Sequence, residues 1–144
     1  MRAVAAVSAG LAIAVASPAA ANHRRPISET YEVTAPVPYP GDFMSPEHCA
    51  AGVEGVTRDT HALTLPDRGL LEVELTGFLG GWVVELYDAH GRLLEQGAEF
   101  DPTNPAPARK LSYQNARPGQ HLRIAACNVN GGPNATVRYT FTFR

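Results

Sequence analysis

The chain has 144 residues, and its 12 basic and 14 acidic side chains give a formal net charge of −2 at pH 7. Lys110 is its only lysine, and no run of basic residues is longer than two, so the sequence lacks the clustered positive surface that binds nucleic-acid phosphates. The length is that of one ordinary domain. Composition therefore predicts a single domain with no nucleic-acid partner.

The first 21 residues predict an export signal. Arg2 gives a positive start, residues 3–16 form an apolar run, and the small residues up to Ala21 are typical of a cleavage site. The apolar run is shorter than the ~20 residues that span a bilayer. We therefore expect a secreted protein without a membrane anchor, extracellular or, in a host with an outer membrane, periplasmic. The alanine-rich leader is typical of bacteria.

Residues 22–60 predict an irregular, proline-rich strap that packs on the rest of the domain, because repeated prolines interrupt any helix. One short strand is expected over residues 27–33. Cys49 in the strap and Cys127 are the only cysteines, and in an exported chain an even count favours one structural disulfide between them. The alternative is a pair of buried thiols.

Residues 61–144 predict the core of the domain, because apolar and polar residues alternate as in strands with one buried face. A tight turn over residues 88–91 joins two of these strands as a hairpin. The strands are predicted over residues 70–76, 82–87, 92–96, 110–114, 120–127 and 135–143. The expected fold class is all-β: a jelly-roll-like antiparallel β-sandwich with one disulfide, in which residues 22–144 form one domain.

The sequence offers no catalytic constellation. None of the three serines after the leader lies in a G-x-S-x-G elbow. Glu72, Glu74 and Glu85 occupy outward strand positions, where solvated carboxylates are expected rather than a glycosidase pair. The five histidines lack the close spacing of a metal site. We expect no enzyme, no cofactor and no metal.

Candidates for ligand contact come from strand ends and turns. Trp82 shares a strand face with Val84 and Leu86, so we expect it in the core rather than as an exposed sugar platform. Tyr87 lies on the opposite face beside the hairpin turn and is the better candidate for an exposed aromatic. The candidate ligand-binding residues are Tyr87, Asp88, His90, Asn128 and Asn130.

Four pieces of the chain carry a family resemblance: the strand opening at Gly69, the block over residues 77–91 around Trp82, the turn Pro118-Gly119 that leads into residues 122–124, and the closing strand over residues 137–141. In these pieces the chain resembles the bacterial pre-peptidase C-terminal domain family. The resemblance implies a small, non-catalytic, jelly-roll-like sandwich of the kind appended to secreted hydrolases, where it serves targeting, substrate binding or maturation. The acidic residues that the family often carries around its aromatic position are replaced here by Gly81 and Val83.

These observations predict a secreted, monomeric binding module that recognises an extracellular polysaccharide or protein. An alternative is a structural or inhibitory protein that docks on a partner enzyme by an exposed sheet edge or by the proline-containing loop over residues 100–108. A small hydrolase ranks last. Exposed aromatics around Tyr87 would favour a sugar ligand, whereas an apolar patch around the loop would favour a protein partner.

Overall fold

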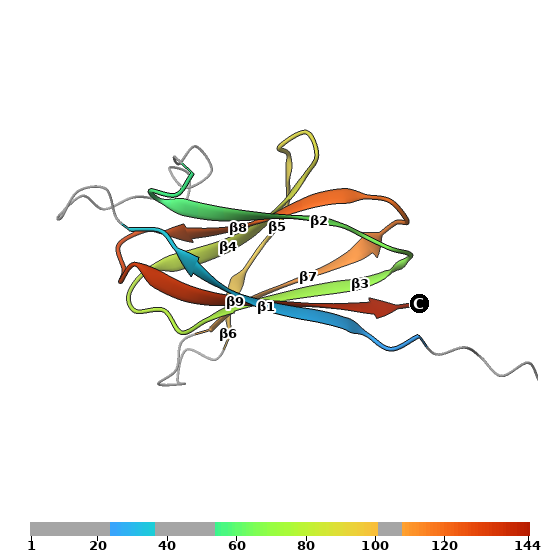
Figure 1. Ribbon diagram of the computed structural model, residues 1–144, viewed down its shortest axis with the longest axis horizontal. Helices are drawn as coiled ribbons and strands as arrows, with labels where there is room; N and C mark the ends of the chain where they lie inside the picture. The colour runs from blue at the N-terminus through green and yellow to red at the C-terminus, as the bar shows by residue number, and fades with distance from the viewer. Residues whose placement is uncertain (1–23, 37–53, 101–107) are drawn as a thin grey trace, which may run out of the picture.

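The protein folds as two antiparallel β-sheets packed face to face (Figure 1). The computed structural model describes residues 24–36, 54–100 and 108–144. In these ranges it contains strands and turns but no helix, and so no helix long and apolar enough to cross a bilayer. The strands are β1 (Ile27–Thr34), β2 (Arg58–Thr64), β3 (Gly69–Thr76), β4 (Trp82–Asp88), β5 (Leu93–Gln96), β6 (Ala98–Phe100), β7 (Ala108–Ala116), β8 (His121–Asn128) and β9 (Asn134–Phe143). The expected all-β sandwich is confirmed.

The two sheets have the strand orders β1-β9-β3-β7-β6 and β2-β8-β4-β5. Every strand predicted from alternation is present, and β4 and β5 form the expected hairpin. β1 lies inside the segment expected to be an irregular strap, at the position of its one predicted strand, and pairs along its length with β9. β2 and β6 were not predicted. In β2, polar and apolar residues do not alternate regularly, and β6 has only three residues.

The core lies between the sheets and is built from the inward positions of the alternating strands. Leu71 and Leu75 of β3 are fully buried, as are Val84 and Leu86 of β4. Trp82, at the start of β4, is 1% exposed and donates a hydrogen bond from Nε1 to the carbonyl oxygen of Gly132 at 3.0 Å. The predicted core position of Trp82 is therefore confirmed, and its single polar atom is satisfied.

The outward face of β4 is buried as well, contrary to expectation. Tyr87 is 7% and Glu85 3% exposed, and the Tyr87 hydroxyl donates to Glu85 Oε2 at 2.5 Å. Burial, together with the carboxylate of Glu85, raises the pKa of Tyr87. On the same face Val83 and Cys127 form a second apolar cluster. The expectations of an exposed Tyr87 and a solvated Glu85 were wrong, because alternation assigns a residue to a face but does not say whether that face is covered.

The edge of the sandwich between β1 and β2 is closed by stacked rings. Tyr31 of β1 stacks on His61 of β2 with ring centroids 4.4 Å apart, and Tyr139 lies beyond His61 at 5.8 Å. The Tyr139 hydroxyl donates to Glu29 Oε2, and burial with this hydrogen bond raises the pKa of Tyr139 to about 12. His61 therefore serves as a packing residue in this cluster.

Several expectations fall on residues outside the described ranges. These are the leader, residues 22–23 and 37–53 of the proline-rich strap with Cys49, and residues 101–107 of the proline-containing loop. Cys127 is 1% exposed, and no free cysteine occurs in the described part of the chain. The pairing of Cys127 with Cys49 stays a prediction.

Candidate functional site

The candidate residues from the sequence lie at two opposite ends of β4. Asp88, at one end, pairs across the sheet with Leu122, whereas Trp82, at the other, pairs with Asn128. Asp88 ends β4 at the hairpin turn, which also holds the exposed His90, while Asn128 ends β8 and Asn130 lies in the loop between β8 and β9. The structure therefore does not bring the five candidates together in one site.

Asp88 holds the β4–β5 turn together. Its Oδ1 accepts hydrogen bonds from the backbone N–H groups of His90 and Arg92, both at 2.9 Å, and its Oδ2 pairs with Arg92 Nε at 3.2 Å. The backbone hydrogen bond from Arg92, with the one from His90 and the Arg92 charge, lowers the pKa of Asp88. Asp88 therefore remains ionised and neutralises Arg92.

Asn128 stabilises the loop that follows β8, and its side chain is inaccessible to a ligand. Its side chain is fully buried. Nδ2 donates to the carbonyl oxygens of Ala35, Gly131 and Gly132 at 2.7, 3.1 and 3.0 Å, and Oδ1 accepts from the N–H of Gly131 at 2.7 Å. Asn130 is exposed, but its Oδ1 accepts from the N–H of Gly81 at 2.7 Å. Both asparagines therefore have structural roles in this loop.

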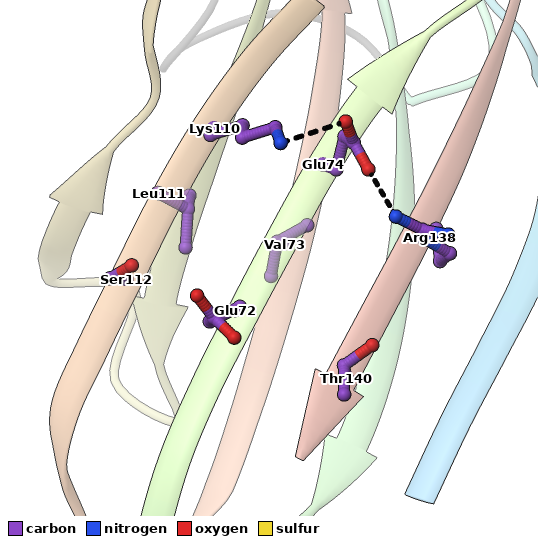
Figure 2. A pocket seen from close by; sticks show the side chains of 8 residues that line it. All are labelled: Glu72, Val73, Glu74, Lys110, Leu111, Ser112, Arg138 and Thr140. Atoms are coloured by element: carbon purple, nitrogen blue, oxygen red, sulfur yellow. Dashed lines mark hydrogen bonds and ion pairs between the residues drawn. The ribbon is translucent and has the colours of Figure 1, made fainter. Parts of the chain in front are cut away.

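The outward face of the five-stranded sheet carries charged and hydroxyl side chains around a shallow pocket of about 140 Å³ (Figure 2). Glu74 of β3 lies between two cations: Oε1 is 3.1 Å from Lys110 Nζ on β7, and Oε2 is 2.6 Å from Arg138 Nη2 on β9. Partial burial acts to raise the pKa of Glu74, but the hydrogen bonds and charges of Lys110 and Arg138 outweigh it and lower that pKa. This ion-pair network joins three strands, and no aromatic side chain lines the pocket.

Glu74→Gln tests this network. We expect a loss of at most about 1 kcal/mol in the free energy of unfolding at pH 7, because exposed ion pairs contribute little. Since the folded state lowers the Glu74 pKa, the stabilisation is present above the ordinary glutamate range and disappears as pH falls through the folded pKa. Urea unfolding should show a smaller difference between the two proteins at pH 3 than at pH 7. Glu72→Gln, on the same strand face, is the control and should leave stability unchanged at both pH values.

Two adjoining pockets lie at the end of the sandwich where β7 leads into β8, which is the end that carries the C terminus in Figure 1. They have volumes of about 400 and 420 Å³ and share Asn115, Arg117 and Pro118. Arg92 lines the first pocket and Arg68 lines the second. We call this continuous surface, marked by Arg68, Arg92, Asn115 and Arg117, the arginine groove.

Backbone and side-chain hydrogen bonds fix the turn that carries Arg117. Gly119 has a φ of 73°, which glycine adopts without strain, and its N–H donates to the carbonyl oxygen of Leu65 at 2.8 Å. Gln120 Oε1 accepts from the N–H of Arg117 at 3.1 Å, while Gln120 Nε2 donates to the Tyr113 hydroxyl at 2.9 Å. The wall of the groove is thus preorganised.

The charges of the groove are unbalanced. Arg92 is paired with Asp88, but neither Arg68 nor Arg117 forms an ion pair with an acidic side chain in the described ranges. Asp67, next to Arg68, pairs instead with Arg24 at 3.0 Å. Two guanidinium groups therefore line the groove without an ion pair to any described acidic side chain. Guanidinium donates paired N–H groups that match the two oxygens of a carboxylate or sulfate.

The sequence indicates Gly69 and the turn Pro118-Gly119 but does not identify the arginines that precede them, Arg68 and Arg117, as a site. The only signal was that both turns contain an arginine beside glycine or proline, which by itself does not indicate a site. Within the described residues no group of three or more His, Cys, Asp or Glu side chains is placed to hold a metal ion.

The comparisons with known proteins do not assign this chain to a family. No family model matches the chain, and no curated protein matches it. Among solved structures, the chain is similar to dimeric latent PorU from Porphyromonas gingivalis, with 13% sequence identity and a TM-score of 0.34. The match covers 88% of this chain and 14% of the PorU chain. An identity and a TM-score this low carry no argument about function.

Proposed function

We propose that this protein is a secreted, non-catalytic binding module that holds an extracellular polysaccharide in the arginine groove. The observation that carries the proposal is the groove itself, in which two arginines without an acidic partner among the described residues and the Asn115 amide line a preorganised surface at the loop end of the sandwich. The proposal includes export, the Cys49–Cys127 disulfide and a jelly-roll-like relation to the pre-peptidase C-terminal domain family. The leader, the cysteine count and the sequence resemblance support these parts.

The chemistry of the groove supports binding rather than catalysis. No serine and no histidine lines either pocket. Asp88, the one carboxylate in the lining, is held by the hairpin turn and by Arg92. The Tyr113 hydroxyl is engaged by Gln120. The lining therefore supplies hydrogen-bond donors and positive charge, but no nucleophile with an adjacent base.

The polarity of the groove favours a polysaccharide over a protein partner. More of its lining is polar than apolar: three arginines and two amides lie beside the apolar side chains of Leu94, Ala116 and Pro118. The large apolar side chains that are exposed in the described ranges, Ile27, Leu79 and Leu93, belong to three different segments. Stable protein interfaces have an apolar centre, which this arrangement does not provide.

Affinity electrophoresis of the purified protein through gels that contain neutral, carboxylated or sulfated polysaccharides tests the proposal. We expect at least one polysaccharide to retard the protein. Asn115→Leu, which replaces a groove amide with an apolar side chain, should weaken this binding by about tenfold, the factor that corresponds to 1.4 kcal/mol. Gln114→Leu is the matched control, because the neighbouring Gln114 is exposed but does not line the groove. Retardation by no polysaccharide, or equal effects of the two variants, would contradict the proposal.

A further inference from the structure

We infer that the ligand of the arginine groove is an anionic polysaccharide, and that Arg68 and Arg117 bind its acidic groups. This inference rests on the proposed function and specifies its ligand class. The acidic groups are either carboxylates of uronic acid residues or sulfate esters, since both present two or more oxygens to a guanidinium fork.

The first argument is the contrast between the three arginines. Arg92 has its counter-charge within the chain, because Asp88 lies 3.2 Å from its Nε and shares the same turn. Arg68 and Arg117 have none in the described ranges, although Asp67 is adjacent to Arg68 along the chain. The fold thus neutralises one groove arginine and leaves two available. A neutral sugar chain would leave both positive charges without an ionic partner.

The second argument is the order of the charges along the groove. Arg68 lines one pocket, Arg92 lines the other, and Arg117 lines both. An extended polymer with an acidic group on successive sugars therefore meets more than one arginine as it follows the groove. A single small anion contacts only one of these arginines. Linked contacts of this kind raise the affinity for a polymer above that for its monomer.

The third argument separates a polysaccharide from a nucleic acid. Asp67 and Asp88 lie beside the groove arginines, and the chain as a whole carries a net charge of −2. A phosphate backbone requires a continuous positive surface. The groove instead offers isolated cations beside the Asn115 amide, which can donate to sugar hydroxyls.

The experiment measures the affinity of the full protein for polygalacturonate, alginate, dextran sulfate and neutral dextran of similar chain length. We expect binding to at least one anionic polymer, no binding to dextran, and a loss of affinity of about tenfold or more as ionic strength rises from low to physiological salt. A preference for the uronates identifies carboxylate as the recognised group, and a preference for dextran sulfate identifies sulfate.

Substitution variants test the residues. Arg68→Gln and Arg117→Gln should each weaken binding by about tenfold or more, and the double variant should abolish it. Arg138→Gln is the matched control, since it removes the same charge from the outward face of the five-stranded sheet. It should bind within about twofold of the parent protein. Thermal unfolding of each variant checks that the fold is retained.

The outcomes separate the inference from the proposed function. If neutral dextran binds as tightly as the anionic polymers, and Asn115→Leu still weakens that binding, the inference is overturned and the proposed function stands. If Arg138→Gln weakens binding as much as Arg117→Gln, the attraction is general electrostatics and the inference is overturned. If no polysaccharide binds, both proposals are overturned.

Discussion

Trp82→Ala is expected to lower the free energy of unfolding by about 3 to 5 kcal/mol, because removal of a large buried aromatic leaves a cavity that the surrounding strands refill only in part. Trp82 is 1% exposed and packs closely on the backbone of Gly131, where an added Cβ would lie 3.0 Å from two ring atoms. The substitution also removes one of the two hydrogen bonds to the carbonyl oxygen of Gly132, which keeps the one from Asn128 Nδ2. Urea-induced unfolding followed by circular dichroism measures the change.

Leu79→Ala is the matched control for this prediction. Leu79 belongs to the loop that precedes Trp82 and approaches the same glycines, yet 76% of it is exposed. Its truncation should change stability by less than about 0.5 kcal/mol, as expected for surface substitutions. Equal effects of the two variants, or an unchanged unfolding curve for Trp82→Ala, would refute the assignment of Trp82 to the core.

Asn128→Asp is expected to destabilise the protein by a similar amount, about 3 to 5 kcal/mol at pH 7, although it changes one atom of the side chain. The amide nitrogen of Asn128 donates to three backbone carbonyl oxygens in a fully buried position. An aspartate places a second oxygen there and creates a buried charge, and the described contacts of this side chain are all with backbone groups, none with a cation.

The pH dependence of this variant has a defined sign. Burial among carbonyl oxygens raises the pKa of the introduced carboxyl group above its unfolded value, so the penalty grows as pH rises above about 4. The difference from the parent protein should therefore be smaller at pH 4 than at pH 7. Asn130→Asp serves as the control, because the exposed side chain keeps an oxygen for the N–H of Gly81. A penalty for Asn128→Asp that does not depend on pH would contradict this explanation.

Alternation predicted the strands in which one face is apolar and the other polar. β3 and β9 follow this pattern residue by residue, and both lie inside the five-stranded sheet. The alternation did not predict β2, because the inward positions of this strand include Asp59 and His61 as well as Leu63. At the edge of the sandwich His61 is accommodated by stacking on Tyr31, which a pattern of apolar residues does not reveal. The sequence therefore predicted interior strands better than edge strands.

The arginine groove could not be predicted, because its parts come from separate connections in the chain. Arg68 precedes β3, Arg92 precedes β5, and Arg117 follows β7. Alternation describes strands and says nothing about which loops meet at one end of a sandwich. The expected aromatic site at Tyr87 failed for a related reason, since the burial of that strand face depends on what packs over it.

The position of β9 has a consequence for biosynthesis. β9 is the last of the described strands in chain order, yet it lies between β1 and β3 and pairs with both of them. While the ribosome has not yet produced residues 134–143, β1 has no neighbour in its sheet and one edge of β3 is open. Unpaired edges of this kind promote association between chains. The pairing of β9 with β1 and β3 also joins segments that are distant along the chain, and pairing of this kind slows folding. The five-stranded sheet is therefore completed only after synthesis of β9.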